Sequence, residues 1–209
     1  MLNFGGADYP YLSNTDILPD FIKSIAIQLA SINGFEEKII TIGPRFIKEL
    51  ACLEEYGYII QTCSHEEFLT LIKSTNLLMS VPGLTSTFEA FSLSIPTLFL
   101  PPMNYSQLLN LQKLKNSGVA DYSINWHDLY DVPDEILEET QGVSLVESFL
   151  TKSLINNEMQ ISMKNRFETE INNKENLHSL ANKQKCFFEK CGGVGTHEAV
   201  NLIKNLIYG

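Results

Sequence analysis

Basic residues are scarce in this sequence. Lys and Arg together number 15 against 25 Asp and Glu, so the formal net charge is -10. Such a chain lacks the basic surface that nucleic-acid backbones and anionic membranes attract, and we expect neither as a partner. Long apolar runs are missing too. The longest candidate, residues 95–103, is interrupted by prolines and falls well short of the roughly 18 residues that a membrane span needs.

Cysteine is also sparse, with 4 in 209 residues and no Cys-x-x-Cys pair. The 4 histidines show no metal-ligand spacing, so the sequence predicts no metal site. No basic segment followed by an apolar one opens the chain, as a secretory signal would require. We therefore expect a cytoplasmic protein with reduced thiols.

Short β-branched runs alternate with segments of helical period over residues 1–125. In the first helical segment Ile17, Phe21, Ile25 and Leu29 share one face. Apolar strands between such helices are typical of a parallel sheet covered on both faces. The sequence thus predicts an α/β fold with a Rossmann-like, doubly wound parallel sheet of about six strands. The expected strands are residues 2–4, 38–42, 58–62, 77–81, 97–100 and 119–124.

The strand pattern stops after residue 125. Residues 126–140 form an acidic connector, and residues 143–172 and 177–208 have helical patterns, the second around a break at 191–195. We expect residues 126–209 to pack as a connector and C-terminal helices on the core formed by residues 1–125.

A glycine pair follows the first expected strand. In open parallel sheets ligands bind beyond the carboxyl ends of the strands. Gly5 and Gly6 in residues 4–8 let the backbone approach a diphosphate closely. A plain turn explains the pair equally well, and the segment matches neither the dinucleotide fingerprint nor the P-loop.

Hydroxyl side chains follow the fourth expected strand. Thr85, Ser86 and Thr87 lie where the N-cap of a helix belongs, so free amides there can hold phosphate oxygens. Glu89 comes about one turn later, and a carboxylate can accept two hydrogen bonds from a ribose diol. An ordinary capping arrangement, with a favourable Glu near the helix start, fits the spacing at least as well.

Two amide side chains follow the fifth expected strand. Gln107 and Asn110 share one face near the start of a helix and can bind sugar hydroxyls. The alternative is a solvated helix N-terminus.

The order of these segments along the chain resembles a known family. A strand, Gly-x-x-(Ser/Thr)-x-x-Glu-Ala, a helix, Ile-Pro-Thr-Leu-Phe-Leu-Pro and Gln-x-x-Asn resemble the C-terminal, donor-binding domain of GT-B glycosyltransferases. The likeness is to the UDP-N-acetylglucosamine transferase that forms lipid II and to the UDP-sugar hydrolase of pseudaminic acid synthesis. Residues 4–8 and 42–44 resemble the hydrolase in particular. The resemblance covers most of residues 1–125.

The resemblance implies a set of donor-binding roles. Gly5 and Gly6 lie beside the diphosphate, and Leu84, Thr85 and Ser86 offer amides and hydroxyls to the phosphates. Glu89 binds the ribose hydroxyls, and Gln107 binds the donor sugar. Main-chain groups near Ser64 and His65 frame the uracil. No cofactor or metal is implied, because GT-B enzymes generally work without a bound metal.

The resemblance also implies a missing partner, since GT-B enzymes act in a cleft between two Rossmann-like domains. The N-terminal acceptor domain, or a partner subunit in its place, is not part of this sequence. The expected function is therefore the nucleotide-sugar-binding half of a glycosyltransferase, inactive alone, with an unknown acceptor. One alternative is a nucleotide-sugar hydrolase. Another is a non-catalytic domain that binds a partner, which Pro82 and Glu198 favour because they depart from the family pattern.

Overall fold

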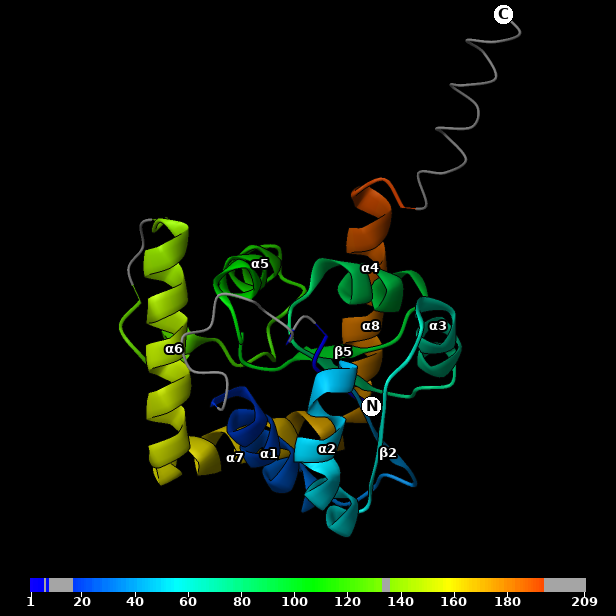
Figure 1. The fold of residues 1–209 in the computed structure, drawn as a ribbon. Helices are drawn as coiled ribbons and strands as arrows, with labels where there is room; N and C mark the ends of the chain where they lie inside the picture. The colour runs from blue at the N-terminus through cyan, green and yellow to red at the C-terminus, as the bar shows by residue number, and fades with distance from the viewer. Residues whose placement is uncertain (6, 8–16, 133–135, 194–209) are drawn as a thin grey trace, which may run out of the picture.

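A central parallel sheet organises the computed structural model, which describes residues 1–5, 7, 17–132 and 136–193 (Figure 1). All four strand pairs are parallel, and the order is β3-β2-β1-β4-β5. Strand order therefore reverses between β1 and β4, which is the topological switch point of a doubly wound sheet. The α/β class and the Rossmann-like parallel sheet are confirmed. The strands are β1 (Leu2–Asn3), β2 (Lys38–Thr41), β3 (Tyr58–Gln61), β4 (Leu78–Ser80) and β5 (Thr97–Phe99).

The prediction of a sixth strand is wrong. Residues 119–124 are described and form no strand, and their one ladder-like contact with β5 joins the Ile124 amide to the Phe99 carbonyl at 3.3 Å. Gln184 hydrogen-bonds to the edge of β5 at Thr97. Its amide accepts a hydrogen bond from the Thr97 N–H at 3.0 Å and donates to the carbonyls of Thr97 and Val119 at 2.8 and 3.0 Å. The edge groups of β5 at Thr97 are thus satisfied by a side chain.

Helices cover both faces of the sheet. The main core joins the sheet to α1, whose face of Ile17, Phe21, Ile25 and Leu29 is buried as the sequence predicts. On the other face α3 and α4 meet around Ile72 and Ala90. The helices before residue 120 are α1 (Ile17–Ala30), η1 (Pro44–Phe46), α2 (Ile47–Leu50), η2 (Ala51–Tyr56), α3 (His65–Lys73), α4 (Leu84–Ser92) and α5 (Tyr105–Asn116).

Three further helices pack on this core. They are α6 (Glu139–Ile155), α7 (Asn157–Asn172) and α8 (Lys174–Lys190), with η3 (Trp126–Asp128) before them. In Figure 1 α6 and α7 lie against α1, and α8 passes behind α4 and packs against it. The α8–α4 contact is aromatic, because the ring of Phe88 lies 6.3 Å from that of Phe187 and 6.1 Å from that of Phe188. The end of the predicted tail, from residue 194, lies outside the described residues.

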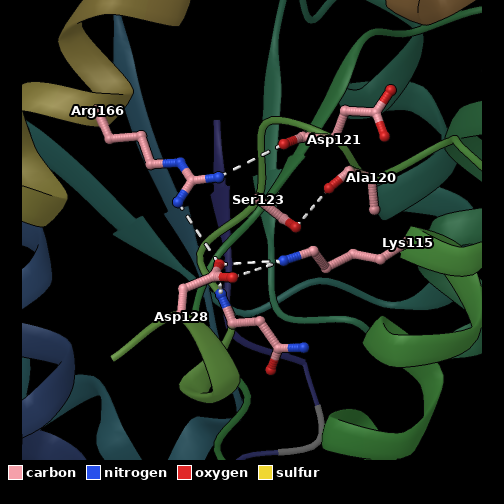
Figure 2. A network of polar contacts seen from close by, with 7 residues as sticks. Lys115, Ala120, Asp121, Ser123, Asp128 and Arg166 are labelled. Carbon is pink, nitrogen blue, oxygen red and sulfur yellow. Dashed lines mark hydrogen bonds and ion pairs between the residues drawn. The ribbon is translucent and has the colours of Figure 1, made fainter. Parts of the chain in front are cut away.

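The connector after residue 125 is anchored to the core. Trp126 is fully buried and donates from Nε1 to the Pro102 carbonyl at 2.7 Å. Figure 2 shows the Asp128 carboxylate between two cations, with Lys115 Nζ of α5 at 2.8 Å and an Arg166 guanidinium nitrogen of α7 at 3.5 Å. Asp128 therefore joins α5 and α7, a contact that the prediction of an acidic connector did not include.

No helix in the described part of the chain is long and apolar enough to cross a membrane.

Candidate functional site

Three polar side chains form a floor at the carboxyl ends of the strands, where strand order reverses. Asn3 ends β1, Thr41 ends β2 and Ser80 ends β4, and all three are buried. Asn3 Nδ2 donates to Ser80 Oγ at 3.0 Å, and Thr41 Oγ1 donates to Asn3 Oδ1 at 3.1 Å. This network links the carboxyl ends of three adjacent strands. Sequence reasoning missed it, although a polar residue at the end of each apolar strand was a visible signal.

The glycine loop after β1 is attached to this floor. The amide of Gly5 donates to Asn3 Oδ1 at 3.2 Å. A Cβ at position 5 would lie 3.4 Å from that same oxygen, so the loop runs close over Asn3. Gly6, whose backbone was expected to lie beside the diphosphate, is outside the described residues.

Helix α4 begins at the switch point without a side-chain cap. Its N-cap is Gly83, and the first helical bond runs from the Thr87 amide to the Gly83 carbonyl at 3.1 Å. The amides of Leu84, Thr85 and Ser86 therefore precede the first intrahelical bond. Neighbouring helices differ, because Ser64 caps α3 and Asn104 caps α5. No acidic residue lies in the first turn of α4, so its N-terminus keeps the positive end of the helix dipole.

Glu89 lies one turn into α4 and faces α3. Its Oε1 is 3.4 Å from Nδ1 of His65, and the Glu89 side chain is 18% exposed whereas that of His65 is 63% exposed. Burial raises the pKa of the Glu89 carboxyl, and the nearby His65 opposes that shift by favouring the charged form. The structure thus brings together two residues that the sequence placed on separate segments of one site.

The backbone amide and the hydroxyl of Ser64 are both hydrogen-bonded to Glu67 of α3. The Ser64 amide and Oγ both contact Glu67 Oε2 at 2.8 Å, and the Glu67 amide donates back to Ser64 Oγ at 3.3 Å. This reciprocal capping box accounts for Ser64 without a ligand. The hydrogen bonds hold the pKa of the Glu67 carboxyl below its ordinary value.

Gln107 and Asn110 turn toward the loops and not toward solvent. Gln107 is 3% exposed, accepts from the Met103 amide at 2.9 Å and donates to the Gly5 carbonyl at 3.4 Å. Asn110 Nδ2 donates to the Pro82 carbonyl at 3.2 Å. The solvated alternative is wrong for Gln107, which is buried, whereas Asn110 is half-buried and hydrogen-bonded to the loop after β4.

A small apolar cavity lies at the opposite, amino-terminal end of the strands. Leu29, Phe35, Tyr58 and Met79 contribute to its lining. None of the predicted donor-binding residues lines it.

Comparison with known proteins finds no matching family model and no matching curated protein. Among the described residues, no group of three His, Cys, Asp or Glu side chains is arranged as a metal site.

Proposed function

We propose that this chain binds a nucleotide sugar at the switch point and forms the donor-binding half of a GT-B glycosyltransferase. The observation that supports this most directly is the start of α4. A helix N-terminus without a side-chain cap lies at the switch point, the place in the topology where doubly wound folds bind ligands, and Glu89 lies one turn further along the same helix.

Each part of a nucleoside diphosphate has a matching group in this arrangement. The amides of Leu84, Thr85 and Ser86 bind phosphate oxygens, and the helix dipole favours their negative charge. The Glu89 carboxylate accepts hydrogen bonds from the ribose diol and is kept away from the phosphates by one helical turn. The His65 imidazole, which contacts Glu89, lies at the ribose and base end. We favour uracil as the base, on the strength of the sequence resemblance.

The same groups define a catalytic contribution. Negative charge accumulates on the diphosphate when the bond to the sugar breaks, and fixed amides aimed at that charge stabilise the transition state. The acceptor and the general base belong to a second domain or a partner chain. Expected behaviour of the 209-residue chain alone is therefore nucleotide binding without sugar transfer.

Isothermal titration of the folded chain with UDP, GDP and dTDP tests the proposal. We expect the tightest binding for UDP, because dTDP lacks the 2′-hydroxyl that Glu89 would bind. A folded sample that releases no heat with any of the three nucleotides contradicts the proposal.

Hydrolysis of a nucleotide sugar is the second candidate. It is supported by the sequence of residues 4–8 and 42–44 and by the exposed imidazole of His65, whose Nδ1 lies 3.4 Å from Glu89 Oε1. Incubation of a UDP-sugar with this chain and its partner domain, without an acceptor, separates the two activities. Release of free sugar favours the hydrolase, and an absolute requirement for an added acceptor favours the transferase.

A further inference from the structure

Two side chains of α5 each reach a different loop at the carboxyl ends of the strands. Gln107 donates to the Gly5 carbonyl after β1, and Asn110 donates to the Pro82 carbonyl after β4. The two residues are three positions apart, so they lie on one face of the helix. One rigid element therefore contacts both loops that we propose to flank the diphosphate.

The position of α5 itself is well fixed. Asn104 caps its first turn by accepting from the Gln107 amide at 2.9 Å, and Leu108, Leu111 and Leu114 are buried in the core. The side-chain amide oxygen of Gln107 also accepts a hydrogen bond from the Met103 N–H. Because α5 cannot shift without breaking these contacts, its side chains are suited to fix the loops that they contact.

The Asn110 contact acts on the start of α4. Pro82 directly precedes Gly83, the N-cap, and proline has a restricted φ and no N–H of its own. A hydrogen bond to the Pro82 carbonyl therefore orients the last peptide before the helix. That peptide adjoins Gly83, whose φ of -80° and ψ of 135° lead directly into the first amides of α4.

We infer that Asn110 is a positioning residue for the diphosphate: it holds the Pro82 carbonyl and thereby aims the amides of Leu84, Thr85 and Ser86. This role rests on the proposed function, but it needs no contact between Asn110 and the ligand. It predicts an effect on phosphate binding and none on the nucleoside.

The test compares UDP and uridine on the full 209-residue chain. Asn110→Leu removes the donor without adding charge, and we expect it to weaken UDP binding by about threefold to tenfold, the range for one neutral hydrogen bond. Uridine affinity, measured by NMR titration, should stay within about twofold. Asn110→Gln keeps the amide donor and should restore UDP affinity. Asn116→Leu makes the same kind of change on the exposed end of α5 and should leave both ligands unaffected.

A second measurement does not depend on any ligand. The Thr87 amide donates to the Gly83 carbonyl, and its hydrogen exchange should become faster in Asn110→Leu but not in Asn116→Leu. If leucine at position 110 unfolds the protein, Asn110→Ser replaces it in both experiments.

The outcomes distinguish failure of the positioning role of Asn110 from failure of the proposed function. Equal losses of UDP and uridine affinity, or no loss of either, overturn the positioning role and leave UDP binding by the wild type standing. A wild-type chain that binds no UDP overturns the proposed function and this role with it.

Discussion

The side-chain amide of Gln184 pairs with both backbone groups of Thr97, at 3.0 Å to the N–H and 2.8 Å to the carbonyl. An edge strand usually leaves such groups open to another chain. Here a residue 87 positions away closes the edge of β5 and attaches α8 to the sheet. The C-terminal helices are thus joined to the domain by polar contacts as well as by the aromatic contacts of Phe88.

Replacing Gln184 should therefore destabilise the whole domain. Gln184→Leu leaves the Thr97 groups and the Val119 carbonyl buried without their partner, and we expect a loss of about 2–4 kcal/mol in the free energy of unfolding. Urea denaturation measures it. Asn182→Leu, at an exposed position of the same helix, should change stability by less than about 0.5 kcal/mol. Equal stability of the two variants would show that the amide contributes nothing at this edge.

Asp128 should make stability depend on acid pH. Burial by itself raises the pKa of Asp128, but the hydrogen bonds from Lys115 and the Asn125 amide and the charges of Lys115 and Arg166 outweigh it and hold the pKa below its ordinary value. The folded-state pKa is therefore lower than the unfolded one. The resulting stability is present above the unfolded pKa, roughly 3.9, and is lost as the pH falls through the folded pKa.

Asp128→Asn tests this contribution. We expect a loss of about 1–2 kcal/mol at pH 7, because hydrogen bonds to a charged group are removed at a partly buried site. The difference from the wild type should shrink as the pH is lowered. Asp121→Asn is the matched control, since its carboxylate lies 3.7 Å from Lys183 in an exposed pair, worth less than about 1 kcal/mol. A deficit for Asp128→Asn that stays constant down to acid pH would contradict the linkage.

Nucleotide affinity should also depend on pH, through Glu89. Because burial raises the pKa of its carboxyl, Glu89 takes up a proton at a higher pH than an ordinary glutamate does. A protonated Glu89 is a poorer acceptor for the ribose diol, so affinity should fall as the pH drops toward the raised pKa. His65→Gln removes the group that opposes the shift, and the fall should then begin at a higher pH.

A UDP-sugar is the right ligand for that titration, because both of its phosphates are esterified and stay charged throughout. The 2′,3′-dideoxy analogue should show no such pH dependence on either protein. A midpoint that does not move in His65→Gln would mean that the 3.4 Å contact has no electrostatic effect on Glu89.

The parts of the fold that local pattern determines are the parts that the sequence predicted. The apolar runs at β2 and β3 are strands, and the helix face of Ile17 and Phe21 is buried. Both were predictable because hydrophobic periodicity and β-branching can be read from neighbouring residues. Residues 119–124 carry the same strand signal. They form a turn in place of a strand, because the Ser123 amide and hydroxyl both donate to the Ala120 carbonyl. The Val119 carbonyl accepts instead from Gln184, a side chain 65 positions away that no local pattern near residue 119 predicts.

The candidate site divides in the same way. Sequence order placed Leu84 and Glu89 at the start of a helix after a strand, which the structure has. The hydrogen-bond partners of the polar side chains could not be predicted from the sequence. Gln107 and Asn110 bind the backbone of two distant loops, and Asn3 joins Ser80 across the sheet, because strand order decides which loops become neighbours.

The most direct test of the account is the affinity of wild type and Glu89→Gln for UDP and for 2′,3′-dideoxy-UDP. If the carboxylate accepts the ribose hydroxyls, the substitution should weaken UDP binding by about 1–3 kcal/mol, the range for charge-assisted hydrogen bonds. Binding of the dideoxy nucleotide should barely change. The thermal melting temperature should stay the same or rise slightly, because the folded state binds the Glu89 proton more readily than the unfolded chain and ionisation at neutral pH costs stability. Undiminished UDP affinity in Glu89→Gln, or equal losses for both nucleotides, would contradict the account.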